Sequence, residues 1–241
     1  MRVRRPLHPS PLTIVLSSAI ISLVLSAAVV AAPTTSQSLR VLPPNGSSQA
    51  FAVSMHFDVP AGAHNHGPGS GHGPQDESGN MVVKRTDLAD AAITLTGVAD
   101  SSSASHSVSG QTVDAGSPPD PYIVAFDNAA SIAAGESASV KAGDSWQTSI
   151  QTVDASGTVN SINVKTVVST ASGDSIQLHA TGNGTETFST PRGDRTADVT
   201  VDITESLVGN RLIEFDQKFS RTMQGHMGSF KTTATTTLKS S

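Results

Sequence analysis

Four of the eight histidines lie close together, at His56, His64, His66 and His72. Neutral imidazole is a common ligand of zinc and copper, and nearby acidic side chains such as Asp76 can complete a site. In an extended loop, the rings of His64 and His66 would point the same way, and the surrounding glycines would let the loop wrap around an ion. The sequence therefore offers one candidate function, a metal-binding protein that holds Zn or Cu through His64, His66 and His72.

The segment that carries these histidines favours a simpler interpretation. Residues 60–80 contain no large apolar side chain and are rich in glycine and proline. Such a segment cannot bury enough apolar surface to become ordered, and a metal site needs ligands on rigid elements. We therefore predict a disordered Gly/Pro/His loop at 60–80 and no cofactor, and we keep metal binding as the alternative.

Two methionine–histidine pairs could supply thioether and imidazole ligands to Cu(I) if their strands were neighbours. They are Met55-His56 and His226-Met227, with Met223 nearby. The alternative places the methionines in the core and the histidines on the surface.

A second chemical candidate is Gly143-Asp-Ser-Trp146, which looks like the nucleophile block of serine esterases. Those enzymes need a late Asp followed closely by a histidine to activate the serine. Here the late histidine, His226, has no such Asp, and Ser145 begins a strand. The acidic pair Asp198 and Asp202 lies on the polar face of a strand, which suits a surface. We therefore predict no enzyme and no catalytic residues, with a hydrolase as the second alternative.

Composition excludes several function classes. The chain has 15 Lys and Arg against 20 Asp and Glu, a formal charge of −5. Nucleic-acid binding needs clustered basic side chains, so we expect no nucleic-acid partner. The absence of cysteine removes disulfides, thiol nucleophiles and Cys-ligated metals. Aromatic residues are 4% of the chain, which disfavours stacking platforms for sugars or bases.

The first 32 residues have the pattern of a secretory signal peptide. Basic residues at 2–5 precede an uncharged apolar stretch at 11–32 that ends in small residues. The alternative is an uncleaved signal anchor, because the apolar run is long enough to span a bilayer. Either reading predicts an exported protein, periplasmic or extracellular, that meets a membrane only through an uncleaved leader. Residues 33–49 are polar and interrupted by prolines, which predicts a flexible tether.

Residues 50–241 have the features of a single β domain. Large apolar side chains alternate with polar ones, the pattern of half-buried strands. One helix is expected at Asp120–Ile132, because Asp120 is a good N-cap and proline follows it at the first helical position. Strands are expected near 51–59, 91–98, 106–113, 140–152, 159–168, 176–180, 199–203, 212–219 and 230–238.

Turn residues separate these runs, among them Ser172-Gly-Asp174, Gly182-Asn-Gly184 and Val208-Gly-Asn210. Short connections between alternating strands favour an antiparallel meander. The predicted fold class is therefore mainly β, an antiparallel meander that forms a curved half-barrel or barrel with one short helix. A parallel α/β fold would need several crossover helices, and the pattern shows one.

Over about residues 118–238 the chain resembles uncharacterised exported bacterial proteins in which a helix precedes a Gly-Asp-x-Trp strand and the sheet ends in a Gly-x-x-Leu/Ile hairpin. The corresponding segments are the helix at Asp120–Ile132, Lys141-Ala-Gly-Asp-Ser-Trp146 and Gly209-Asn-Arg-Leu-Ile-Glu-Phe-Asp216. The resemblance implies a curved sheet or half-barrel comparable to the lipoprotein-carrier fold. It assigns no activity, and this chain lacks the cysteine that many such proteins lipidate.

The function that we expect first is non-enzymatic binding of an apolar ligand or a protein partner on the concave face of the sheet. Burial at about 25 cal/mol per Å² lets a modest acyl chain bind without specific chemistry. The large side chains expected to line that face are Phe51, Phe57, Trp146, Phe188, Phe215 and Phe230.

Overall fold

The structure is a computed structural model that describes residues 41–58, 75–85, 90–98, 105–109, 112–113, 120–134, 140–153, 158–190, 193–225 and 228–241. Backbone contacts divide the chain into Met1–Ala31 and Ala32–Ser241. Every described residue belongs to the second unit, so the leader and residues 60–74 of the expected loop lie outside the described residues.

The described residues form one antiparallel sheet and one helix. The strands before the helix are β1 (Ser48–Asp58), β2 (Gln75–Arg85), β3 (Asp90–Thr96), β4 (Ser105–Ser109) and β5 (Thr112–Val113), and the helix is α1 (Pro121–Ala134). The strands after it are β6 (Ser145–Val153), β7 (Val159–Ser172), β8 (Ser175–Thr190), β9 (Gly193–Val208), β10 (Arg211–Gly225) and β11 (Gly228–Ser240). The predicted fold class, a curved antiparallel meander with one short helix, is confirmed.

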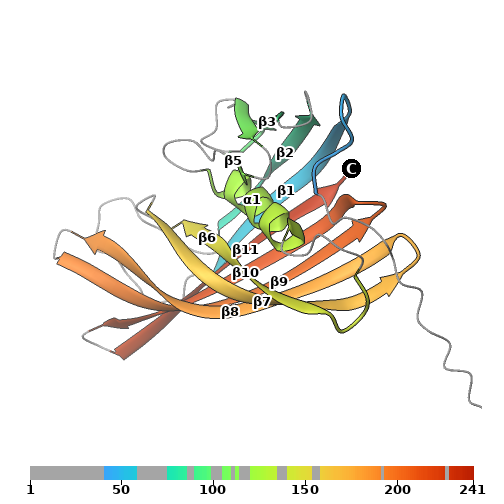
Figure 1. Ribbon diagram of the computed structural model, residues 1–241. Coiled ribbons are helices and arrows are strands. Elements are labelled where there is room, and N and C mark those ends of the chain that lie inside the picture. The colour runs from blue at the N-terminus through green and yellow to red at the C-terminus, as the bar shows by residue number, and fades with distance from the viewer. Residues whose placement is uncertain are drawn as a thin grey trace, which may run out of the picture. The chain divides into compact units, whose positions relative to one another are not determined.

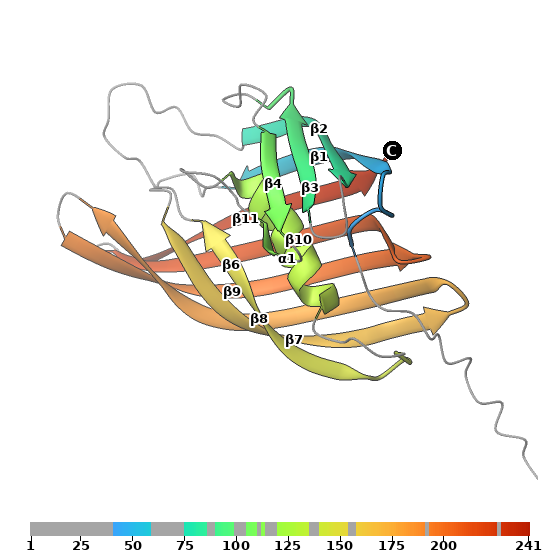
Figure 2. The same ribbon diagram turned by 45° about the horizontal axis from the view of Figure 1, so that its top comes forward.

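The order of strands in the sheet is β5-β4-β3-β2-β1-β11-β10-β9-β8-β7-β6. The first strand therefore pairs with the last one, and the two edge strands are β5 and β6. Since α1 follows β5 and precedes β6, the chain must cross the sheet from one edge to the other between them. Figures 1 and 2 show the result: α1 lies inside the curve of the sheet, with β1–β3 on one side of it and β6–β8 on the other.

Helix α1 begins at the predicted cap. The Asp120 carboxylate accepts hydrogen bonds from the backbone N–H groups of Tyr122 and Ile123, at 2.9 and 3.3 Å. Eleven of its fourteen residues are buried, which is the pattern of a helix surrounded by protein on all sides. Phe126 packs edge-on against Phe51 of β1, with ring centroids 6.0 Å apart. Within the residues that the structure describes, no helix has the length and apolar character needed to cross a membrane.

Polar side chains fasten α1 to the edge strand β6. The Asn128 amide donates to the Gln151 carbonyl at 2.8 Å and accepts from the Gln151 N–H at 2.8 Å, and it also donates to the Gln217 side chain at 2.7 Å. The Trp146 indole N–H donates to the carbonyl of Ile132 at 3.0 Å. The buried amide of Asn128 is thus fully used, and the helix is fixed to both β6 and β10.

Two expectations about the N-terminal part of the domain were wrong. Residues 75–80, assigned to the disordered loop, begin β2 and pair with β1, because backbone pairing holds a strand whose side chains are small and polar. Residues 41–49, assigned to the tether, pack against the core: Val41 and Leu42 are buried, and Ser48 begins β1. The packed domain therefore begins by Val41.

The expected turn at Gly182-Asn-Gly184 was also wrong, because these residues lie in the middle of β8. A Cβ atom on Gly182 would stand 2.4 Å from the backbone oxygen of Asn163 in β7 and 2.9 Å from a methyl of Val164. Gly182 is the register partner of Val164, so the glycine permits a close approach between these two paired strands. The other expected turns, at Gly173-Asp174 and Gly209-Asn210, are present, and Gly209 and Asn210 have positive φ angles of 56° and 61°.

We expect Gly182→Ala to lower the free energy of unfolding by about 1–3 kcal/mol, because the added methyl group overlaps the backbone of β7. The matched control is Gly184→Ala in the same strand, where the new Cβ would lie 3.3 Å from an Ile162 side-chain carbon that can shift. Urea unfolding of both variants measures the difference. Equal stabilities of the two variants would contradict the proposed close approach.

Candidate functional site

A small pocket of about 50 Å³ lies beside the N-terminal end of α1. It lies on the face of the sheet that the helix covers. Five elements supply its walls, which are formed by Met55, Phe57, Pro121, Val124, Gln151, Thr152, Val153, Gln217, Phe219, Arg221, Ala234 and Thr236.

The sheet register explains the apolar wall of the pocket. Ala234 of β11 lies between Phe57 of β1 and Phe219 of β10 as the cross-strand neighbour of both. Since Ala234 carries only a methyl group, it leaves a depression between the two aromatic rings. Val124 of α1 and Met55 of β1 also line this depression. Phe57 is half-buried, so the wall is open to solvent on that side.

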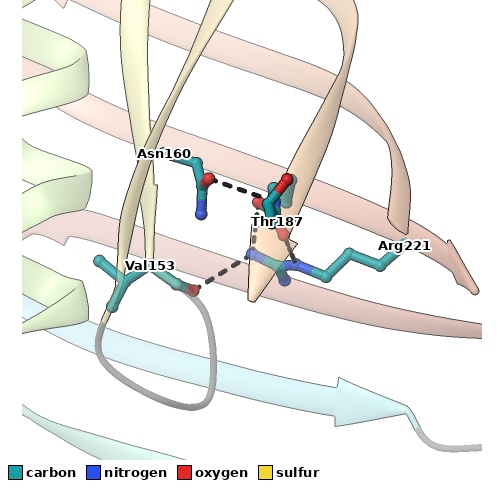
Figure 3. Close-up of polar contacts among 5 residues, drawn as sticks. Val153, Asn160, Thr187 and Arg221 are labelled. Atoms are coloured by element: carbon teal, nitrogen blue, oxygen red, sulfur yellow. Dashed lines mark hydrogen bonds and ion pairs between the residues drawn. The ribbon is translucent and has the colours of Figure 1, made fainter. Parts of the chain in front are cut away.

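Arg221 supplies the charged group of the pocket lining, and Figure 3 shows its polar contacts. Its Nε and Nη2 atoms donate to the two carboxylate oxygens of Glu186 at 2.6 and 3.1 Å, and Nη2 also donates to the carbonyl of Val153 at 3.2 Å. The Glu186 side chain is 1% exposed and that of Arg221 is 17% exposed. The guanidinium carbon lies 5.5 Å from the centre of the Phe219 ring. The pair is bidentate, so it fixes the plane of the guanidinium group as well as its position.

Two further polar side chains, Asn160 of β7 and Thr152 of β6, lie at this end of the domain. The Asn160 side-chain oxygen accepts from the backbone N–H of Thr187 at 3.4 Å, as Figure 3 shows, whereas its Nδ2 atom is buried without a partner. Thr152, which lines the pocket, also has a buried hydroxyl without a partner. This end of the domain therefore holds hydrogen-bonding capacity that the described protein atoms do not use.

The six aromatic side chains expected to line a ligand face have different positions. Phe57 lines the pocket. Phe51 and Phe215 are fully buried in the core, and Trp146 is half-buried with its indole bonded to α1. Phe230 is half-buried on β11, opposite Met223, and the side chain of Phe188 lies outside the described ones.

Sequence reasoning missed most of the pocket. Phe219 follows Phe215 by four residues in a strand, so period two already places both on one face, and this signal identifies Phe219. The contact of Arg221 with Glu186 has no local signal, since it joins β10 to β8 across β9.

Of the histidines proposed as metal ligands, the structure describes only His56. His64, His66, His72, His226 and Met227 lie outside the described residues. His56 is exposed on β1 and contacts Asp76 at 2.5 Å, and no group of three or more His, Cys, Asp or Glu in the described part of the chain could hold a metal ion. Zinc or copper binding by the loop remains a prediction.

Of the three methionines proposed as copper ligands, the two that the structure describes, Met55 and Met223, lie far apart. Met55 is aligned through Thr236 with Gln217 of β10, six residues from Met223, which corresponds to about 20 Å along a strand.

The esterase-like segment forms a turn. The backbone N–H of Lys141 donates to the Asp144 carboxylate at 2.9 Å, and Gly143 has a φ of 91°. Ser145 is exposed at the start of β6. Asp198 and Asp202 are exposed on β9, four residues apart, and Asp202 contacts His179 at 2.9 Å. These contacts account for the acidic residues as parts of a turn and of the solvent-facing surface.

One carboxyl group is buried among apolar neighbours. Glu205 of β9 lies between Leu178 and Phe215 in the register of the sheet, and neither of its carboxylate oxygens has a partner among the described residues. Burial raises the pKa of Glu205 well above its usual value of 4.5. The folded protein therefore favours the neutral, protonated form of this side chain.

Compared with the profiles of protein families, with curated proteins and with solved structures, the chain has no match. The resemblance to exported half-barrel proteins therefore stays a prediction.

Glu205→Gln tests the protonation state of this carboxyl. A raised folded-state pKa means that the folded protein binds more protons than the unfolded chain above about pH 4.5, so this residue lowers stability as pH rises. The slope approaches about 1.4 kcal/mol per pH unit until the folded-state pKa is reached. We expect the stability of Glu205→Gln relative to the wild type to increase from pH 4 to pH 8 in urea unfolding. Glu214→Gln, at a residue on the opposite face, is the control, and a relative stability of Glu205→Gln that does not change with pH would disprove the assignment.

Proposed function

We propose that the protein is a non-enzymatic exported binding protein that holds the end of a small apolar or amphipathic molecule in the pocket between α1, β1, β6, β10 and β11. The observation that carries this proposal is the depression at Ala234, with aromatic walls from Phe57 and Phe219 and a polar end at Arg221. An apolar cavity with a few convergent polar groups is the usual form of a small-molecule site.

The helix limits how much of the sheet a ligand can reach. Because α1 is buried on nearly all sides, it occupies most of the face that was expected to form a groove. The ligand site is therefore confined to the end of the helix near Pro121 and Val124. A ligand therefore has access to this pocket and not to the whole concave face of the sheet.

The volume of the pocket limits the ligand further. Ordinary small-molecule pockets have volumes of about 300–1,000 Å³, so a pocket of about 50 Å³ admits the end of a hydrocarbon chain and not a whole acyl chain. Burial of an apolar area on the order of 100 Å² contributes about 2.5 kcal/mol, and the rest of the ligand must add contacts at the rim. We expect affinities near millimolar for short probes.

Titration with 1-hexanol tests the proposed function. We expect saturable NMR shift changes at the methyl groups of Met55 and Val124 in the wild type. Ala234→Leu fills the depression and should abolish these changes, because the new side chain occupies the space between Phe57 and Phe219.

Ala52→Leu is the matched control, since Ala52 is exposed in the same sheet on the face away from α1. It should bind the probe as the wild type does. Absence of saturable binding to the wild type, or unchanged binding to Ala234→Leu, would rule the pocket out.

A further inference from the structure

Arg221 has unused donors at the pocket. A guanidinium group carries five N–H bonds. Three of them are used by Glu186 and Val153, through Nε and Nη2. The two N–H bonds of Nη1 have no acceptor among the described residues, and Arg221 lines the pocket. Nη1 is not among the buried atoms that lack a partner, so its two N–H bonds are open to solvent and available to a ligand that reaches this end.

The charge of Arg221 is already balanced. Glu186 is bound to it through both carboxylate oxygens and is almost fully buried. Arg221 is the one charged residue among the residues that line the pocket, so its partner leaves the site electrically neutral overall. An anionic ligand would bring an excess negative charge into a half-buried site, and desolvation of that charge is unfavourable.

From these two observations we propose that the pocket selects an uncharged acyl ester over the corresponding carboxylate, with the ester carbonyl oxygen accepting hydrogen bonds from Nη1 of Arg221 and the hydrocarbon lying between Phe57 and Phe219. This inference rests on the proposed function and adds the class of ligand. Glu186 is a specificity-determining residue in this scheme, because it cancels the charge that would otherwise attract an acid.

The experiment compares methyl hexanoate with hexanoate at pH 7, by NMR titration of the full chain. In the wild type we expect the ester to bind about tenfold more tightly than the carboxylate. In Glu186→Gln the amide keeps the shape of the side chain but no longer neutralises the charge of Arg221. The ratio of ester affinity to carboxylate affinity should therefore fall to about one or below. Glu186→Asp keeps the charge and should retain the preference for the ester.

The Glu186→Gln arm separates this proposal from a plain preference of an apolar pocket for uncharged molecules, which would leave the ratio unchanged. If Glu186→Gln does not fold, the double variant Glu186→Met with Arg221→Met replaces the ion pair by apolar side chains of similar size. It should bind the ester about tenfold more weakly than the wild type, because the Nη1 donors are gone.

Three results would overturn the inference: equal or tighter binding of hexanoate in the wild type, an unchanged ratio in Glu186→Gln, or unchanged ester affinity in the double variant. In each of these cases saturable binding of 1-hexanol would leave the proposed function standing. If neither hexanoate, nor its methyl ester, nor 1-hexanol binds the wild type, the proposed function fails and the inference fails with it.

Discussion

The pairing of β1 with β11 is the constraint on which the rest of the structure depends. It joins the strands on either side of α1 in the sequence into one sheet and leaves β5 and β6 at opposite edges. A chain that must travel between these edges has to pass over one face, and the apolar face gains most from being covered. The position of α1, the burial of its surface and the small size of the remaining pocket all follow from this single junction.

The buried polar groups of the domain fall into two kinds. Asn128 and Arg221 form hydrogen bonds that join elements distant in sequence. Glu205 and Tyr122 have buried oxygen atoms without partners in the described residues. Groups of the first kind specify how the helix and the sheet fit together, whereas those of the second kind weaken the fold. A domain without disulfides retains such groups only if its sheet and core supply enough stability.

How much the sequence predicted depends on whether the signal is local. The alternation in 199–203 and the Asp120-Pro121 cap identified β9 and α1, because period and capping are properties of neighbouring residues. The turn predicted at Gly182 was wrong because a glycine in a turn and a glycine at a close approach of two strands look the same in sequence. The Arg221–Glu186 pair could not be predicted either, since residues 35 positions apart meet only once the register of β8, β9 and β10 is set.

The two hydrogen bonds between the Asn128 amide and the backbone of Gln151 affect whether another molecule can pair with the edge strand β6. An edge strand with unpaired backbone N–H and C=O groups can pair with a strand of another chain, and repeated pairing of this kind produces fibrils. Here a side chain imitates one peptide unit of a further strand and occupies those groups. At Gln151, therefore, the edge of β6 has no vacant peptide group with which another strand could pair.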